Sequence, residues 1–203
     1  MPSYTFQGIV PVVDRTAFVH PLASLIGDVI IGPGCYIGPG ASLRGDLGRI
    51  IVEAHCSIQD SAVVHVSSQR DTQIGRGATI AHGAVIHGCE IGANAIVGIN
   101  SVVLDNAVIG AESLIGALAL VTSAQVVPPR SLVLGAPARV VRTLQEHEIS
   151  WRNDGASTYS RLARESLSGL MEVAPLAAVE PSRPRVKGEA VPVRLPIRAN
   201  APS

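Results

Sequence analysis

Aliphatic residues recur at every sixth position along most of this chain, and small or polar residues separate them. The period runs from Val19 to Val133, with longer steps after Leu43 and Val64 and a shorter step after Ile86. A short fixed period of this kind predicts a parallel β-helix, in which each unit forms one short strand and one corner. The repeated residues are Val19, Leu25, Ile31, Ile37, Leu43, Val52, Ile58, Val64, Ile74, Ile80, Ile86, Ile91, Val97, Val103, Ile109, Ile115, Val121, Val127 and Val133.

Three such units close one triangular coil, so residues three units apart stack on consecutive coils. The aliphatic residue of each side points inward, while Gly and Asn supply the positive φ angles of tight corners. Only 3% of the residues are aromatic although 47% are hydrophobic, which fits a core of Val, Ile, Leu and Ala. We therefore predict an all-β fold with this β-helix over residues 1–142.

Two further segments follow the predicted coil. Residues 143–174 are expected to form a helical appendage that packs on the coil, with a first helix over 143–153 that breaks at Asp154 and Gly155. Residues 175–203 contain six prolines and predict an extended, mostly unstructured tail. The second helix is predicted from an apolar stripe at helical spacing, formed by Tyr159, Leu162, Ala163, Leu167, Leu170 and Met171.

Charge and cysteine content narrow the functional classes. Sixteen basic residues balance sixteen acidic ones, so we expect neither nucleic acid nor a membrane as a partner. Neither a secretory leader nor a long apolar run is apparent, which favours a cytoplasmic protein. Cys35, Cys56 and Cys89 are odd in number and lie inside the repeat, so they predict buried, reduced thiols.

Three histidines can be placed by counting units. His65 and His87 each follow an aliphatic residue, and these two aliphatic residues are three units apart, so both rings point outward on consecutive coils about 4.8 Å apart. They can share one metal ion. His82 belongs to the preceding side of the triangle, which spans roughly 18–20 Å. A neighbouring chain must therefore supply it, and a homotrimer suits a triangular coil best.

The same count places two charged residues beside these histidines. Arg44 falls in the column of His65, and Asp60 falls in the column of His82, with Gln59 beside it. Arg44 is therefore expected to face Asp60 of the neighbouring chain. Such an Arg and carboxylate can pair in bidentate fashion and set the register of the assembly.

Three neutral imidazoles with one open coordination position form a catalytic zinc site, since structural zinc sites normally have a fourth protein ligand. Zinc lowers the pKa of a bound water to about 7 and so provides a hydroxide nucleophile at neutral pH. Fe²⁺, Co²⁺ and Ni²⁺ also accept imidazole ligands, and the residues do not choose among these metals.

Short motifs at these positions resemble the γ-class carbonic anhydrases, a group of hexapeptide-repeat proteins. They are Arg-Gly-Asp at 44–46, Ile-Gln-Asp at 58–60 and His-Gly-Cys at 87–89, together with His65 and His82. The resemblance implies a left-handed coil and a homotrimer with zinc sites at its subunit interfaces.

The same resemblance assigns roles to individual residues. It makes His65, His82 and His87 the zinc ligands and Gln59 a hydrogen-bonding partner of the zinc-bound hydroxide. It makes Arg44, Asp46 and Asp60 the residues that support the ligands and the interface.

The C-terminal part resembles one branch of that group, the PaaY-type and CaiE-type proteins of phenylacetic acid degradation and carnitine operons. The similarity lies at Trp151 and at segments 165–171, 173–176 and 179–181. For PaaY-type proteins it implies hydrolysis of CoA thioesters, with CO₂ hydration in some members. The founding type of the family carries an acidic loop that shuttles protons, whereas the short loop over 66–73 has no Glu, which argues against fast hydration.

These inferences predict a metal-dependent hydrolase that acts on CoA thioesters of phenylacetate catabolism. Three alternatives remain open. The first is a true γ-carbonic anhydrase whose substrate is CO₂ or bicarbonate. The second is a hexapeptide acyltransferase with a single catalytic histidine, and the third is a non-catalytic trimeric scaffold that keeps a metal site.

Overall fold

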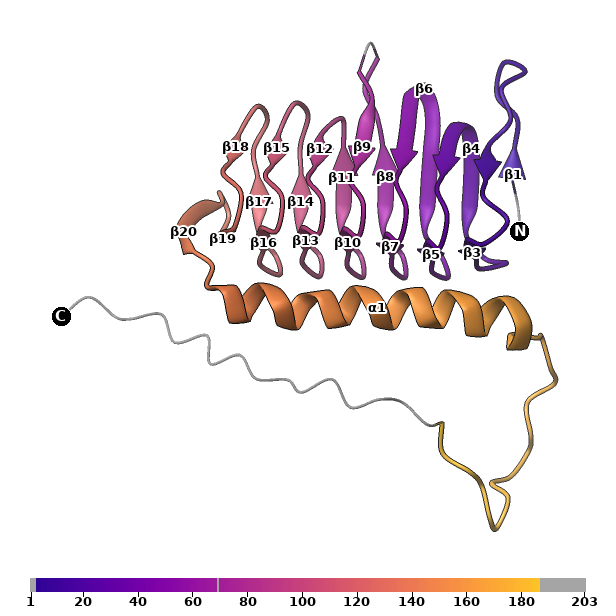
Figure 1. Ribbon diagram of the computed structural model, residues 1–203. Coiled ribbons are helices and arrows are strands. Elements are labelled where there is room, and N and C mark those ends of the chain that lie inside the picture. The colour runs from indigo at the N-terminus through magenta and orange to yellow at the C-terminus, as the bar shows by residue number, and fades with distance from the viewer. Residues whose placement is uncertain (1–2, 69, 187–203) are drawn as a thin grey trace. The chain divides into compact units, whose positions relative to one another are not determined.

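The computed structural model describes residues 3–68 and 70–186, and for 150–157 it describes the backbone alone. Short parallel strands stack coil upon coil into the β-helix that the period predicts, with the left-handed sense that the resemblance implies (Figure 1). One side of the coil carries an eight-stranded sheet. Its strands are β3 (Phe18–Val19), β5 (Tyr36–Ile37), β7 (Ser57–Ile58), β10 (Thr79–Ile80), β13 (Ile96–Val97), β16 (Leu114–Ile115), β19 (Ser131–Leu134) and the antiparallel β20 (Arg139–Thr143).

The other two sides form a single twelve-stranded sheet, because two long strands pass around the corner between them. These are β4 (Ser24–Ile31) and β6 (Ser42–Val52). At this corner Gly27 has φ +72°, and a Cβ there would lie 2.5 Å from the carbonyl oxygen of Gly45. The shorter strands are β1 (Ser3–Tyr4), β8 (Val63–His65), β11 (Val85–His87), β14 (Val102–Val103) and β17 (Leu120–Val121) on one side, and β2 (Val12–Val13), β9 (Thr72–Ile74), β12 (Glu90–Ile91), β15 (Val108–Ile109) and β18 (Val126–Val127) on the other.

The strand register confirms the predicted stacking of residues three units apart. Val64 pairs with Ile86, and Ile58 pairs with Ile80. All the repeated aliphatic residues belong to one buried cluster except Val19, which is partly buried and packs against it. The three cysteines are free and buried, in agreement with the prediction. Because each rung contributes the same kind of inward side chain, the core is a continuous column of aliphatic groups.

Asn94, Asn100 and Asn106 take positive φ angles of 55°, 54° and 62°, as the corner prediction requires. Leu118 adopts the same conformation, with φ of 61°. A bulky aliphatic side chain disfavours this conformation. The stacked hydrogen bonds of the neighbouring coils therefore determine the corner even where the residue does not favour it.

The prediction of two helices is wrong, because one helix, α1 (Glu146–Gly169), continues through Asp154 and Gly155. A glycine inside a helix costs only about 1 kcal/mol relative to alanine. Residues on both sides of Gly155 pack on the coil: Ile149 belongs to a small buried cluster with Leu144, and Tyr159 packs against Tyr36. A break at Gly155 would release one of these contacts, so the continuous helix is favoured.

The apolar stripe predicted for the second helix is only half buried. Ala163 is fully buried, and Tyr159 and Leu162 are partly buried. Leu167 and Leu170 are about half exposed, and Met171 lies beyond the end of α1. Of the coil strands, α1 contacts β3, β5 and β7, so it covers the eight-stranded side. The side chain of Trp151 lies outside the described residues.

The chain divides into two compact units, Met1–Leu170 and Met171–Ser203. Residues 175–186, the described part of the predicted tail, form no helix or strand. Residues 171–174, which were expected to be part of the helical appendage, form none either, and residues 187–203 lie outside the described residues. No helix among the described residues is long and apolar enough to cross a membrane.

Candidate functional site

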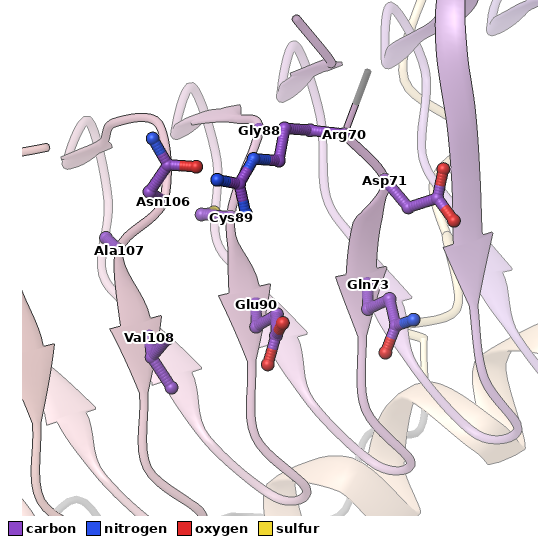
Figure 2. Close-up of a pocket in the computed structure, with 9 residues that line it drawn as sticks. All are labelled: Arg70, Asp71, Gln73, Gly88, Cys89, Glu90, Asn106, Ala107 and Val108. Carbon is purple, nitrogen blue, oxygen red and sulfur yellow. The ribbon is translucent and has the colours of Figure 1, made fainter. Parts of the chain in front are cut away.

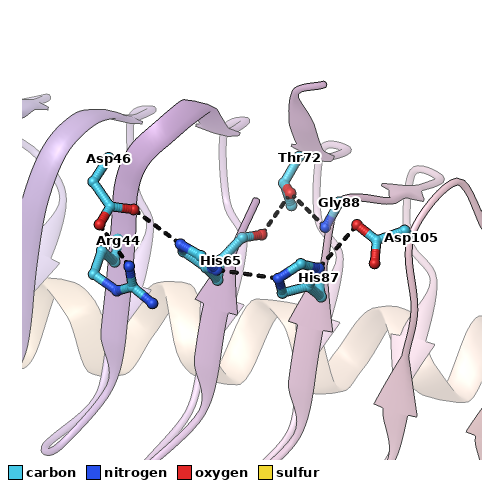
Figure 3. A network of polar contacts seen from close by, with 7 residues as sticks. All are labelled: Arg44, Asp46, His65, Thr72, His87, Gly88 and Asp105. Carbon is cyan, nitrogen blue, oxygen red and sulfur yellow. Dashed lines mark hydrogen bonds and ion pairs between the residues drawn. The ribbon is translucent and has the colours of Figure 1, made fainter. Parts of the chain in front are cut away.

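His65 ends β8 and His87 ends β11, and parallel pairing places them at the same register on consecutive coils. Their ring centroids are 5.0 Å apart, and His65 Nδ1 lies 3.1 Å from His87 Nε2 (Figure 3). We call these two residues the histidine ladder. Its geometry agrees with the count of units in the sequence, which predicts that the two rings lie one above the other.

A carboxylate orients the first ring of the ladder. Asp46 Oδ1 lies 2.9 Å from His65 Nε2, and Asp46 Oδ2 accepts a hydrogen bond from Arg44 at 2.5 Å. Burial raises the pKa of Asp46, but the hydrogen bonds from His65 and Arg44 together outweigh this effect and leave the pKa below its ordinary value. Asp46 is therefore ionised at neutral pH and accepts the N–H of His65.

A second carboxylate, which the sequence analysis missed, orients the other ring. Asp105 Oδ1 lies 2.9 Å from His87 Nδ1. Burial raises the pKa of Asp105, but hydrogen bonds from Ser67 and His87 together lower it by more. The pKa of Asp105 is therefore below its ordinary value. Asp105 lies eighteen residues after His87, whereas Ile86 pairs with Val103 seventeen residues later, so Asp105 lies one position beyond the register of His87. The count that aligned the histidines therefore does not find it.

The hydrogen-bond geometry fits a metal ion between the rings. A ring that donates its one N–H to the carboxylate behind it directs the lone pair of its other nitrogen toward the other ring. Two imidazole ligands of one tetrahedral zinc are about 3.3 Å apart, from Zn–N distances of about 2.0–2.1 Å. The observed separation of 3.1 Å between His65 Nδ1 and His87 Nε2 is close to this value. Carboxylates behind the rings are also typical of metal-ligating histidines.

Thr72 connects the two rungs of the ladder. Its buried hydroxyl donates to the carbonyl oxygen of His65 at 2.8 Å and accepts from the backbone N–H of Gly88 at 3.1 Å (Figure 3). The sequence analysis placed Thr72 in a loop, but it begins β9 and is fully buried. Its hydroxyl therefore fixes the backbones of both histidine-bearing strands relative to each other.

His82 lies elsewhere, in the turn after β10. Its Nδ1 is 2.6 Å from Asp60 Oδ2, so the two residues do stack in one column as predicted. We call His82 and Asp60 the histidine corner. Gln59 precedes Asp60 and is only 5% exposed. Among the residues that the structure describes, no three His, Cys, Asp or Glu side chains of the single chain form a group that could hold a metal ion.

Two further aromatic residues that the sequence analysis did not assign to the site lie near the histidine corner. Tyr36 and Tyr159 have ring centroids 5.3 Å apart. Burial raises the pKa of both phenols, and the negative charge of Asp60 raises both further. The helix α1 therefore brings a hydroxyl-bearing ring to the side of the coil that holds Gln59 and Asp60.

A polar pocket of about 310 Å³ lies next to the ladder, beyond the corner at Gly88 (Figure 2). None of the site residues predicted from the sequence lines it. Its lining residues are Arg70, Asp71, Gln73, Gly88, Cys89, Glu90, Asn106, Ala107 and Val108.

A coil built of six-residue units defines a hexapeptide-repeat protein. A family described as bacterial transferase hexapeptide (six repeats) matches residues 11–45 and 88–123. The carnitine operon protein CaiE of Citrobacter koseri is 48% identical over 188 residues, which cover 93% of this chain and 95% of that protein. The CaiE protein of Escherichia coli O157:H7 is 47% identical over 93% of this chain and 96% of its own length. The chain thus belongs to the hexapeptide-repeat family, with CaiE proteins as close relatives.

Solved structures support the same classification. A putative acetyltransferase from Bacillus cereus is 28% identical, with a TM-score of 0.81 over 82% of this chain and 96% of that one. A hexapeptide transferase family protein from Anaplasma phagocytophilum is 39% identical, with a TM-score of 0.77 over 80% and 96% of the two chains.

Proposed function

We propose that the protein is a metal-dependent hydrolase of CoA thioesters, related to the γ-class carbonic anhydrases and active as a homotrimer. The histidine ladder carries this proposal, because two rings on consecutive coils direct one nitrogen each toward a common point while a carboxylate holds the opposite nitrogen. Zinc is the proposed metal, with Fe²⁺ and Co²⁺ as alternatives.

His65 and His87 would hold the metal together with His82 of a neighbouring copy. In the single chain the His82 side chain is nearly half exposed, and its Nδ1 faces Asp60. We propose that its Nε2, for which no partner is found among the described residues, binds across an interface. Hexapeptide-repeat proteins typically form trimers, and a closed cyclic arrangement repeats the same pairing at every interface. The expected pairing of Arg44 with Asp60 of the neighbouring copy belongs to this proposal, although within one chain Arg44 contacts Asp46.

When bound, the metal supplies a Lewis acid that polarises a carbonyl oxygen and lowers the pKa of water. The chain's own residues keep the ligand nitrogens in position: Asp46 holds His65, and Asp60 holds His82. Gln59 is proposed to hydrogen-bond the attacking water. Hydrolysis adds the oxygen of water to the thioester carbonyl carbon and breaks the C–S bond, which leaves a carboxylic acid and the thiol of CoA.

The relatives named for the carnitine operon and the PaaY resemblance suggest two acyl groups to compare. Release of free CoA would be followed with phenylacetyl-CoA and with the CoA thioester of carnitine, beside CO₂ hydration, before and after removal of zinc. We expect thioester hydrolysis that is lost with the metal, restored by zinc and abolished in His87→Ala. The control is His55→Asn, which changes a histidine outside the site to a residue that tolerates its positive φ.

A second candidate is an acyltransferase, because the solved relatives include a putative acetyltransferase. Such an enzyme would transfer an acyl group from CoA to an acceptor amine or hydroxyl and would keep this activity after chelation. Metal-independent acyl transfer would therefore replace the hydrolase proposal. A zinc-loaded trimer without activity on thioesters, CO₂ or acyl acceptors would favour a non-catalytic scaffold.

A further inference from the structure

Asp105 occupies a position in the hydrogen-bond network that no motif in the sequence marks. It lies in the turn between β14 and β15, one coil beyond His87, and its Oδ1 is 2.9 Å from His87 Nδ1 (Figure 3). Its side chain is one-third exposed, as is that of His87. The contact is therefore a partly shielded hydrogen bond rather than a fully solvated ion pair.

The backbone around Asp105 is held by the coils on both sides. The carbonyl oxygen of Asp105 accepts a hydrogen bond from Ala124 N–H at 2.9 Å, and the N–H of Asn106 donates to the carbonyl oxygen of Gly88 at 2.7 Å. Ser67 contributes a further hydrogen bond to the carboxylate. The carboxylate is thus attached to a rigid part of the fold, and its position relative to His87 is set by the stacking of coils.

We propose that Asp105 is a positioning residue that holds His87 in the tautomer with its proton on Nδ1, so that Nε2 remains an unprotonated metal ligand. The inference rests on the proposed metal-dependent function and adds a residue to it. A neutral imidazole carries one N–H, and the group that accepts this N–H decides which nitrogen is free. Without the carboxylate, the proton would be able to occupy Nε2, where it competes with the metal.

The test measures two quantities on the full-length chain. Zinc affinity is measured by competition with a chromophoric chelator, and the tautomer of His87 is read from imidazole ¹⁵N chemical shifts in the metal-free protein. The variants are Asp105→Ala and Ser67→Ala. Asp28→Asn is the matched control, because Asp28 pairs with Arg49 of the next coil at 3.0 Å, and no contact with a histidine ring is found for it among the described residues.

We expect Asp105→Ala to weaken zinc binding about 10–100-fold, as is typical for partners behind metal ligands. Ser67→Ala, which keeps the carboxylate, should weaken it less, and Asp28→Asn should leave it unchanged. In the metal-free protein, the Nδ1–H tautomer of His87 should be present in the wild type and lost in Asp105→Ala. Thermal unfolding of each variant shows whether the fold is intact, and the tautomer is a readout that a merely structural role would not change.

Two results would overturn the proposal: wild-type zinc affinity in Asp105→Ala, or a His87 tautomer that does not change in this variant. Either can occur while the wild type still hydrolyses thioesters with zinc, in which case the proposed function stands. Conversely, an intact Nδ1–H tautomer that depends on Asp105, in a wild-type protein that binds no zinc, would support the positioning role and contradict the proposed function.

Discussion

The histidine ladder and the histidine corner differ in how firmly the fold holds them. In the ladder, His65 and His87 sit on paired strands, their side chains are 12% and 32% exposed, and carboxylates hold both rings. In the corner, His82 lies in a turn, is 47% exposed and contacts only Asp60 among the described ion pairs. The ladder is therefore organised within one chain, whereas the corner offers its ring outward.

In the proposed interfacial site, the histidine ladder and the histidine corner would therefore have different roles. A ligand pair that is rigid in the single chain loses little conformational entropy when a metal binds. A ligand on an exposed turn can approach a neighbouring copy without disturbing the core. Each chain would then carry two unlike halves of two different sites, and a closed ring of copies would complete all of them.

Complementation between chains tests this division most strongly. His82→Ala and His87→Ala should each lose zinc and thioester hydrolysis, by more than the roughly 10–100-fold expected for a partner behind a ligand. Coexpression of the two variants should restore about a quarter of the sites, because an intact ladder then meets an intact corner at about one interface in four. The measurement is zinc content and activity per trimer in the mixed protein.

Coexpression of His65→Ala with His87→Ala serves as the matched control, since both changes damage the ladder and no mixed interface is complete. Recovery in this control, or none in the first mixture, would contradict the assignment of ladder and corner to different chains.

A smaller effect, on the free energy of unfolding, is expected from the inward residues beneath the histidine ladder and the histidine corner. Ile86 lies under His87, Ile80 lies under His82, and both are fully buried in the same column of aliphatic groups. Ile86→Ala and Ile80→Ala should therefore each lower the free energy of unfolding by a similar amount, about 2–5 kcal/mol. Urea unfolding measures both. Strongly unequal losses would show that the ladder and the corner also differ in the packing beneath them.

The smallest expected effect is on stability and concerns the start of α1, the helix that covers the eight-stranded side of the coil. The pKa of Glu148 is lowered from an ordinary value of 4.5 to about 2, mainly by hydrogen bonds from Arg142. A carboxyl whose pKa is lower in the folded state stabilises the fold above its ordinary pKa. This stabilisation should therefore fade as the pH falls from 4.5 toward 2.

Thermal unfolding at several pH values would show this effect. Glu148→Gln should unfold at a lower temperature than the wild type at pH 7, and the difference should shrink below pH 4.5. Glu146→Gln is the control, because Glu146 is 76% exposed and pairs with Arg130 at 3.1 Å. A difference that does not depend on pH would show that the Glu148 carboxylate is not the stabilising group.

Several features of the site could be predicted from the sequence because a coil with a fixed period converts residue number into position. Counting units placed His65 above His87 and Asp60 beside His82, and the structure has both arrangements. Asp105 and Thr72 were missed for different reasons. Asp105 lies one position beyond the register of His87 and belongs to no motif, whereas Thr72 lies inside the irregular step from Val64 to Ile74, where the period gives no position.

The helix α1, in contrast, was not predicted correctly from the sequence. Local preference at Asp154 and Gly155 predicts a break, but the contacts of Ile149 and Tyr159 with the coil favour a continuous α1. Local preferences of about 1 kcal/mol are readily outweighed by packing on both sides of the predicted break.

The six-residue period by itself determined the coil, its aliphatic core and the two columns in which the histidines lie, because strand pairing repeats at a fixed spacing. Only the tertiary structure decided which carboxylate faces which ring nitrogen, how Thr72 connects the rungs, and that α1 brings Tyr159 next to Tyr36. These contacts depend on side-chain rotamers and on where the chain returns after each corner, and neither is encoded in a repeat.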